Sequence, residues 1–205
     1  MSEGVFDISL NTYSGGDQPN VAVPAGVTSI APRAFRGHAE LICVTIPEGV
    51  RSIGDEAFAG CMGLQRVELP STLEHLGTRA FRNCTHLEYV HLPERLEVVP
   101  KGAFSNCSGL QRVTGGTGLY GICAEAFAGC KSLQECEPLT YAADIGDYAF
   151  SWCIALPDPV LHDPLVYLGK GAFRHCVAFK HVVLPAHVDH LDPDAFIGCE
   201  GLGAF

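Results

Sequence analysis

The chain has 205 residues, and 47% of them are hydrophobic, which is enough to build a continuous core in one or two domains. Lys and Arg number 13 and Asp and Glu number 23, so the formal net charge is −10 and the basic surface expected of a partner of nucleic acid or anionic membrane is missing. No apolar run approaches the roughly 18 residues of a membrane helix, which argues against membrane insertion.

Residues 1–20 precede the regular part of the chain. Phe6, Ile8 and Leu10 alternate with polar residues, which predicts a strand with one buried face, and residues 12–20 carry the Gly and Pro typical of a loop. We expect this segment to form an N-terminal cap. Because no basic region followed by an apolar one is visible after Met1, the sequence as it stands predicts a cytoplasmic protein, or a cell-surface or secreted one if an export signal has been removed.

Residues 21–205 repeat with a fixed period of 23 residues and no insertion. In each unit an apolar residue stands five positions before a phenylalanine, and in seven of the eight units a cysteine stands three positions after it. A fixed period between about 20 and 50 residues indicates a solenoid, in which each unit buries its apolar face against its neighbours. About eight units are present, the last one incomplete, and their phenylalanines are Phe35, Phe58, Phe81, Phe104, Phe127, Phe150, Phe173 and Phe196.

Each unit is expected to hold two extended segments joined by turns. Alternating apolar residues and a following proline predict the first, and Val50–Ile53 is an example of the second, on the opposite side of the coil. Asp55–Ala59 has the length of one helical turn, and the Gly or Asn two residues after Phe suits a left-handed cap. Trp152 and His175 replace that Gly or Asn, which predicts two distorted caps. The first segments are predicted as parallel strands at Leu41–Ile46, Leu64–Leu69 and Leu87–Leu92.

The pattern L-x-x-V-x-L-P-x-x-V-x-x-I-G-x-x-A-F-x-x-C resembles the BspA-type leucine-rich repeat of bacterial and protist proteins. Leu64, Val67, Leu69 and Pro70 begin one such unit, which ends with Ala80, Phe81 and Cys84. The resemblance implies a right-handed solenoid with a parallel β-sheet on one side and short helical turns or loops on the other. It also implies binding rather than catalysis, because the family is similar to surface adhesins and host-interaction proteins. It assigns no site residues.

The repeat pattern weakens between residues 113 and 164. Thr114–Gly118 replaces the Leu-Pro that ends earlier strands, and Pro157–Pro164 brings three prolines into the place of the next strand. Pro159 stands where an inward Val is expected, so a ladder hydrogen bond is lost there. Both a functional irregularity on a regular scaffold and simple repeat drift fit this pattern.

Seven of the ten cysteines occupy one column of the repeat. Parallel side chains about 4.8 Å apart are poorly placed for disulfides, and one Cys per turn cannot gather four zinc ligands. The pattern therefore predicts a ladder of reduced, buried thiols that serve as small hydrophobic residues. Cys43, Cys123 and Cys136 lie outside the column and are the better candidates for reactivity.

The nine histidines and the carboxylates between residues 144 and 194 suggest a weaker alternative, a metal-binding or enzymatic protein. His187 and His190 are three residues apart, with Asp189, Asp192 and Asp194 near them in sequence. No acid–base pair, nucleophile motif or phosphate loop accompanies them. Surface histidines are the preferred interpretation, and we expect no enzyme activity, no metal and no cofactor.

The best candidate site is the outward face of the predicted strands, because side chains alternate between core and solvent along a strand. Basic and aromatic residues gather there, and Tyr and Arg often anchor protein interfaces. The expected partner is a protein or peptide that carries carboxylates. The alternative interpretation is a solvated face whose opposite charges support each other across strands. The candidate partner-binding residues are Arg66, Glu68, Tyr89, His91, Arg112 and Glu135.

A second function remains open, a structural spacer or self-associating scaffold. The sequence stops at Phe205, midway through an expected strand and without a polar cap. An apolar edge at that end would then be covered by another chain or by a continuation of the repeat. Self-association through the open C-terminal end is therefore the alternative to binding a different protein.

Overall fold

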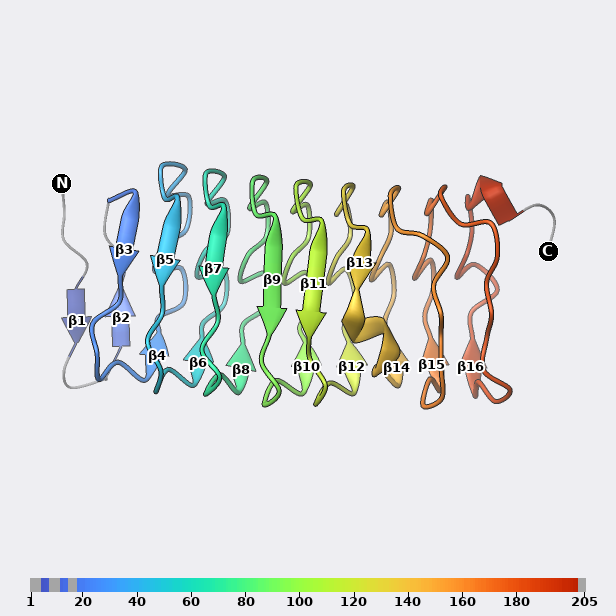
Figure 1. The fold of residues 1–205 in the computed structure, drawn as a ribbon, viewed down its shortest axis with the longest axis horizontal. Coiled ribbons are helices and arrows are strands. Elements are labelled where there is room, and N and C mark those ends of the chain that lie inside the picture. Colours follow the sequence, from blue (N-terminus) through green and yellow to red (C-terminus); the bar gives the residue numbers. More distant parts are fainter. Residues whose placement is uncertain (1–4, 8–11, 15–17, 203–205) are drawn as a thin grey trace.

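The computed structural model describes residues 5–7, 12–14 and 18–202, which coil into a solenoid of parallel strands with very little helix. Successive turns lie side by side in chain order, so β3 (Asn20–Ala22) and β16 (His190–Leu191) are near opposite ends of an elongated molecule (Figure 1). This is the predicted fold class.

One side of the coil carries a six-stranded parallel sheet, called here the strand face. The strands are shorter than predicted because the leucine expected to start each one belongs to the preceding turn, as when the Leu64 N–H donates to the Cys61 carbonyl. Their parallel direction is as expected. The strands are β3, β5 (Cys43–Thr45), β7 (Arg66–Glu68), β9 (Tyr89–Leu92), β11 (Arg112–Gly115) and β13 (Glu135–Cys136).

The opposite side carries two further sheets, to which each repeat unit contributes a strand of two residues, and this confirms the second extended segment of each unit. These strands pair in parallel with their counterparts in neighbouring turns. They are β4 (Ser29–Ile30), β6 (Ser52–Ile53), β8 (His75–Leu76), β10 (Val98–Val99), β12 (Gly121–Ile122), β14 (Asp144–Ile145), β15 (Tyr167–Leu168) and β16.

The N-terminal segment adds a hairpin to one of these sheets. β1 (Val5–Asp7) contains Phe6 and pairs antiparallel with β2 (Thr12–Ser14), and β2 pairs in parallel with β4. The predicted loop over residues 12–20 is therefore wrong in its first part, because β2 continues the ladder of short strands. Ile8 and Leu10 lie outside the described residues.

The segment around each phenylalanine is a series of turns rather than the predicted helical turn. Glu56 and Gly60, two residues on either side of Phe58, both have left-handed backbone, with φ of 55° and 76°. The N–H groups of Glu56, Phe58 and Gly60 donate to carbonyls of the next turn, whereas those between them donate three residues back. This alternation lets backbone N–H groups form hydrogen bonds with the neighbouring turn of the solenoid, whereas a helix would use them within its own segment.

The predicted distortion at Trp152 and His175 is wrong. Their φ angles of 64° and 57° match those of Gly60 and Asn83 in the same column, and the Trp152 N–H donates to the Arg174 carbonyl at 2.7 Å. The hydrogen bonds on both sides fix the backbone, so the bulky side chains adopt the left-handed conformation at a cost of roughly 1–2 kcal/mol each.

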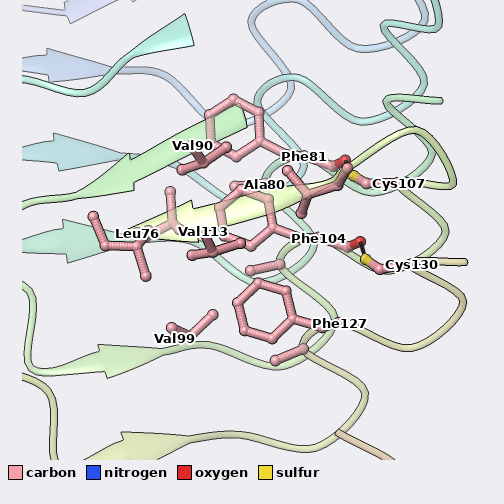
Figure 2. Packing of buried hydrophobic residues seen from close by; sticks show 14 of the residues in the cluster. Leu76, Ala80, Phe81, Val90, Val99, Phe104, Cys107, Val113, Phe127 and Cys130 are labelled. Carbon is pink, nitrogen blue, oxygen red and sulfur yellow. Dashed lines mark hydrogen bonds between the residues drawn. The ribbon is translucent and has the colours of Figure 1, made fainter. Parts of the chain in front are cut away.

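The centre of the coil is filled by a column of stacked phenylalanine rings. Phe104 lies between Phe81 and Phe127, with ring centroids 5.3 and 5.4 Å away and nearly parallel planes (Figure 2). All rings from Phe35 to Phe173 are fully buried, whereas Phe196 is half-buried. Valine and leucine side chains of the two strand layers complete this core.

The seven column cysteines are free thiols and are buried, as predicted, but they are also hydrogen-bond donors. Cys107 Sγ donates to the carbonyl of Phe81 at 3.0 Å, and Cys130 Sγ to that of Phe104 at 3.2 Å (Figure 2). Each bond joins a turn to the one before it. The same contact recurs from Cys61 to Cys199, so a thiol fits this column better than an apolar side chain of equal size.

The three cysteines outside the column differ from one another. Cys43 is half-exposed on the strand face. Cys136 packs against the core, and burial raises the pKa of its thiol well above the usual range. Burial also raises the pKa of the Cys123 thiol, with a smaller contribution from Asp144. Since the thiolate is the reactive form, the raised pKa values make Cys123 and Cys136 weak candidates for reactivity.

Alkaline pH is expected to destabilise the protein through the thiol ladder. Burial raises the pKa of the Cys61 thiol from 9.0 to about 12, so above pH 9 the unfolded chain loses a proton that the folded chain keeps. Stability from this thiol is full below pH 9 and falls towards pH 12, by about 1.4 kcal/mol per pH unit. Urea denaturation of the parent protein and of Cys61→Ser measures the free energy of unfolding at pH 8 and 10.5. Between these pH values the variant should lose less stability than the parent protein. Equal losses would contradict the role of the Cys61 thiol.

The strand face becomes irregular after β13, as predicted from the prolines. The chain forms a short 3-10 helix, η1 (Glu137–Thr140), and the following two turns contribute only an isolated bridge between Val160 and Val183. A second 3-10 helix, η2 (Glu200–Leu202), closes the described part of the chain. None of the described residues forms a helix long and apolar enough to cross a membrane.

Candidate binding surface

The strand face brings the six predicted binding residues together on neighbouring strands. Register places Arg66 of β7 beside Tyr89 of β9, Tyr89 beside Arg112 of β11, and Arg112 beside Glu135 of β13. Adjacent parallel strands are about 4.8 Å apart, so these four side chains form a continuous row. His91 and Glu68 are exposed residues of a second row, two positions further along the strands.

Both arginines of the row already have carboxylate partners within the chain. Arg66 forms an ion pair with Glu68, and Arg112 Nε lies 2.8 Å from Glu135 Oε2. The side chains of the second pair are 60% and 59% exposed, so solvent screens the pair and it contributes about 0–1 kcal/mol. A partner's carboxylate would therefore have to exchange with one from the chain itself.

Tyr89 is the large aromatic residue of the row and is held in place by a hydrogen-bond network. Its side chain is 41% exposed, and its hydroxyl lies 2.8 Å from Thr114 Oγ1. His91 Nδ1 contacts the same Thr114 oxygen at 3.0 Å. Thr114 was not among the predicted site residues. The outward alternation of β11 places it on this face, but the network depends on rotamers that sequence does not specify.

The carboxylates next to this row have structural roles. Glu137 Oε2 accepts a hydrogen bond from the Gly115 N–H at 2.7 Å, and its other oxygen accepts one from the Tyr141 hydroxyl, which raises the pKa of Tyr141. Asp158 accepts the backbone N–H groups of His181 and Lys180, which lower the pKa of its carboxyl. These acids anchor the irregular turns and are not arranged as an acid–base pair.

The histidines of the C-terminal half are distributed singly. His190 stacks on Tyr167 with ring centroids 4.7 Å apart, and His175 packs against Trp152 with centroids 4.1 Å apart and tilted planes. His181 Nδ1 lies 3.5 Å from Asp158 Oδ2. Within residues 5–7, 12–14 and 18–202, no group of three or more His, Cys, Asp or Glu side chains is placed to hold a metal ion.

A family model for the BspA type leucine-rich repeat region matches residues 7–134 and 103–205, in six copies. The chain belongs to the BspA-type leucine-rich repeat family. This family accounts for the solenoid and for the columns of Phe and Cys, and its repeat architecture is generally non-catalytic. None of the strand-face side chains described above is part of the repeat pattern, so membership leaves the site open.

Three solved structures of leucine-rich repeat proteins resemble the chain. One from Bacteroides ovatus is 27% identical over 89% of this chain and 53% of its own, with a TM-score of 0.66. One from T. pallidum is 26% identical over 77% of this chain and 88% of its own, with a TM-score of 0.57. A leucine-rich cell surface protein of Faecalibacterium prausnitzii is 20% identical over 97% and 79%, with a TM-score of 0.55.

The BspA-type chain thus spans about half the length of the Bacteroides ovatus protein. The Faecalibacterium protein is similar in fold alone, because its identity is below a quarter. No curated protein sequence matches the chain. Any partner must therefore be inferred from the surface of this BspA-type repeat itself.

Proposed function

We propose that the chain is a non-catalytic binding module that recognises a protein or peptide through the strand face. The observation that carries this proposal is Tyr89, an exposed aromatic side chain of the row whose hydroxyl lies 2.8 Å from Thr114 Oγ1, an oxygen that His91 also contacts. A fixed aromatic residue loses little conformational entropy on binding, which makes it an effective anchor. Adhesion to a host protein is the form of binding that the family resemblance implies.

The partner is expected to approach with an apolar or aromatic group against Tyr89 and with carboxylates at its edges. Arg66 and Arg112 flank the ring in register, and their solvent-exposed ion pairs can exchange partners at small cost. Charge exchange adds specificity rather than much affinity. Tyr89 should therefore contribute more binding energy than either arginine.

Replacing Tyr89 and Arg112 with Ala should weaken binding by at least about 2 kcal/mol, or roughly 30-fold, because hot-spot residues concentrate binding energy. The partner is first identified by photo-crosslinking from an amino acid placed at position 89, and its affinity is then measured by calorimetry. Thermal unfolding should be nearly unchanged, since neither side chain supports the core.

Tyr120→Ala is the matched control, because Tyr120 is 54% exposed and precedes β12 on the opposite side of the coil. Crosslinking from position 120 should not capture the same partner, and the variant should bind it normally. Equal affinity of the Tyr89 and Arg112 variant and the parent protein would place the site elsewhere.

A second candidate function is self-association through the turn that contains Phe196. Leu191 and Ile197 of this turn are 43% and 49% exposed, and together with Phe196 and Leu202 they line a cavity of about 710 Å³. An apolar surface of this kind favours contact with another protein surface. A mass that rises with concentration supports this role, and a constant monomer mass contradicts it. Phe205, where another chain or a continuation of the repeat was expected to cover an apolar edge, lies outside the described residues.

A further inference from the structure

Trp152 is an exposed aromatic residue at a backbone position that favours glycine. Its φ of 64° is left-handed, its side chain is 50% exposed, and the same column holds glycine at Gly37, Gly60, Gly129 and Gly198. Folding gains little from an exposed indole in a conformation that is unfavourable for bulky residues. The φ is shared by the whole column, so what distinguishes this turn is the exposed indole itself.

The indole packs against an aromatic ring of the next turn. His175, in the next turn, stacks against it with ring centroids 4.1 Å apart and planes inclined by 31°. His175 itself extends over Gly198, where a Cβ atom would collide with the His175 Nδ1. The two rings are thus fixed in the direction of the following turns, and the other face of Trp152 is directed towards the preceding turns.

That second face borders a hollow of about 380 Å³, called here the indole subsite. Gly129 makes room for the indole subsite, because a glycine has no side chain that would fill the space beside Trp152. The amide of Asn106 reaches over Gly129 from two turns before the indole, so a Cβ atom at Gly129 would collide with Asn106 Oδ1. The lining residues are Asn106, Ala128, Gly129, Lys131, Ser151 and Trp152.

The chemistry of the indole subsite fits a sugar ring. The electron-rich face of an indole attracts the slightly positive C–H groups on one face of a pyranose. The Asn106 amide and the Lys131 ammonium supply donors and an acceptor for ring hydroxyls or for a carboxylate. Binding sites of small ligands commonly combine an aromatic surface with a few such polar groups.

Other occupants fit the indole subsite less well. A cationic side chain would also be attracted to the indole face, but the Lys131 ammonium that lines the hollow repels it. A purely apolar side chain would leave the amide and the ammonium without the hydrogen bonds that water gives them. A neutral or acidic saccharide is not repelled by the ammonium, and its hydroxyls can form hydrogen bonds with both polar groups.

We propose that the indole subsite, formed by Trp152, Asn106 and Lys131, binds a pyranose ring of a neutral or acidic glycan. It shares no residue with the strand face, so it is a second binding site beside the one proposed for a protein or peptide. A module with both sites would attach to a protein and to a glycan by separate surfaces.

The chain has a single tryptophan, so its fluorescence reports on the indole subsite alone. The probes are the methyl glycosides of glucose, galactose, mannose and N-acetylglucosamine, together with glucuronate and sialic acid. At least one is expected to shift the emission saturably to the blue and to protect Trp152 from acrylamide quenching. An array of oligosaccharides then extends the result to longer glycans.

Two variants test the assignment of residues. Lys131→Ala keeps the fluorescent reporter and should weaken binding of the active saccharide about tenfold, the effect of losing a charged hydrogen bond. Trp152→Gly should remove retention on the array while keeping or raising the unfolding temperature, since glycine suits this backbone. Tyr89→Ala should leave saccharide binding unchanged, which separates this proposal from the one for the strand face.

The outcome that overturns the proposal is specific. If none of the six saccharides changes the emission or the quenching, the indole subsite does not bind pyranose rings. If the amide of N-acetyl-arginine produces the saturable change instead, the subsite recognises a cationic peptide side chain and the glycan assignment is wrong. If Trp152→Gly retains the array signal, the saccharide binds elsewhere on the chain.

Discussion

Phe104→Ala is expected to lower the free energy of unfolding by about 3–5 kcal/mol. The ring is fully buried in the middle of the stack, between Phe81 and Phe127 at 5.3 and 5.4 Å. Its removal leaves a cavity that the neighbouring rings cannot fill, because the Phe104 N–H donates to the Ala126 carbonyl and the Phe104 carbonyl accepts from Cys130 Sγ, which fixes the spacing of the turns. Urea denaturation followed by circular dichroism measures the loss.

Phe196→Ala is the matched control for this substitution. Phe196 belongs to the same column but is half-buried and has one neighbouring column ring, that of Phe173 at 5.5 Å. Turns of a solenoid are stabilised by their nearest neighbours, so a change in mid-stack weakens contacts on both sides and a change near the end weakens fewer. Equal losses for Phe104→Ala and Phe196→Ala, or a loss below about 1 kcal/mol at Phe104, would contradict the stacked core.

The fold could be predicted from the sequence because the period is unbroken. A 23-residue spacing of Phe and Cys puts equivalent residues side by side in a stack, and apolar alternation specifies the direction of residues such as Val67. The turns could not be predicted in the same way. Arg33, Glu56 and Tyr148 all have φ above 50°, although their residue types give no signal for left-handed backbone. Hydrogen bonds between turns, which no single unit contains, determine that conformation.

On the strand face, too, the positions of the residues could be predicted from the sequence but their side-chain contacts could not. Alternation was enough to put Arg66, Tyr89 and Arg112 on one surface, and the parallel register places them in one row. Alternation does not specify rotamers, so the ion pairs that occupy both guanidinium groups had no sequence signal. For the same reason the hydroxyl of Thr114, which orients Tyr89, was missed.

The thiol ladder should be closed to modification in the folded protein. Cys84, Cys107 and Cys130 are fully buried, and burial holds the pKa of the Cys84 and Cys130 thiols well above the usual range. The thiolate is the form that attacks a maleimide, and the maleimide must also reach the sulfur, so both requirements call for opening of the stack. Their labelling should be at least about 1,000-fold slower than that of the half-exposed Cys43, the lower end of the protection that a stable domain gives.

Mass spectrometry of the labelled peptides, with and without urea, distinguishes the individual cysteines. Cys43 should react in the native state, and the seven column thiols should react together once urea unfolds the chain, because each one donates to a carbonyl of the preceding turn. The same contact links the phenylalanine column to the thiols. In Phe104→Ala, Cys130 keeps the carbonyl of residue 104 as its acceptor but loses the packing of the ring. The labelling rate of Cys130 in the native state should therefore rise towards that of Cys43. Rapid native labelling of all ten cysteines in the parent protein would refute the buried ladder.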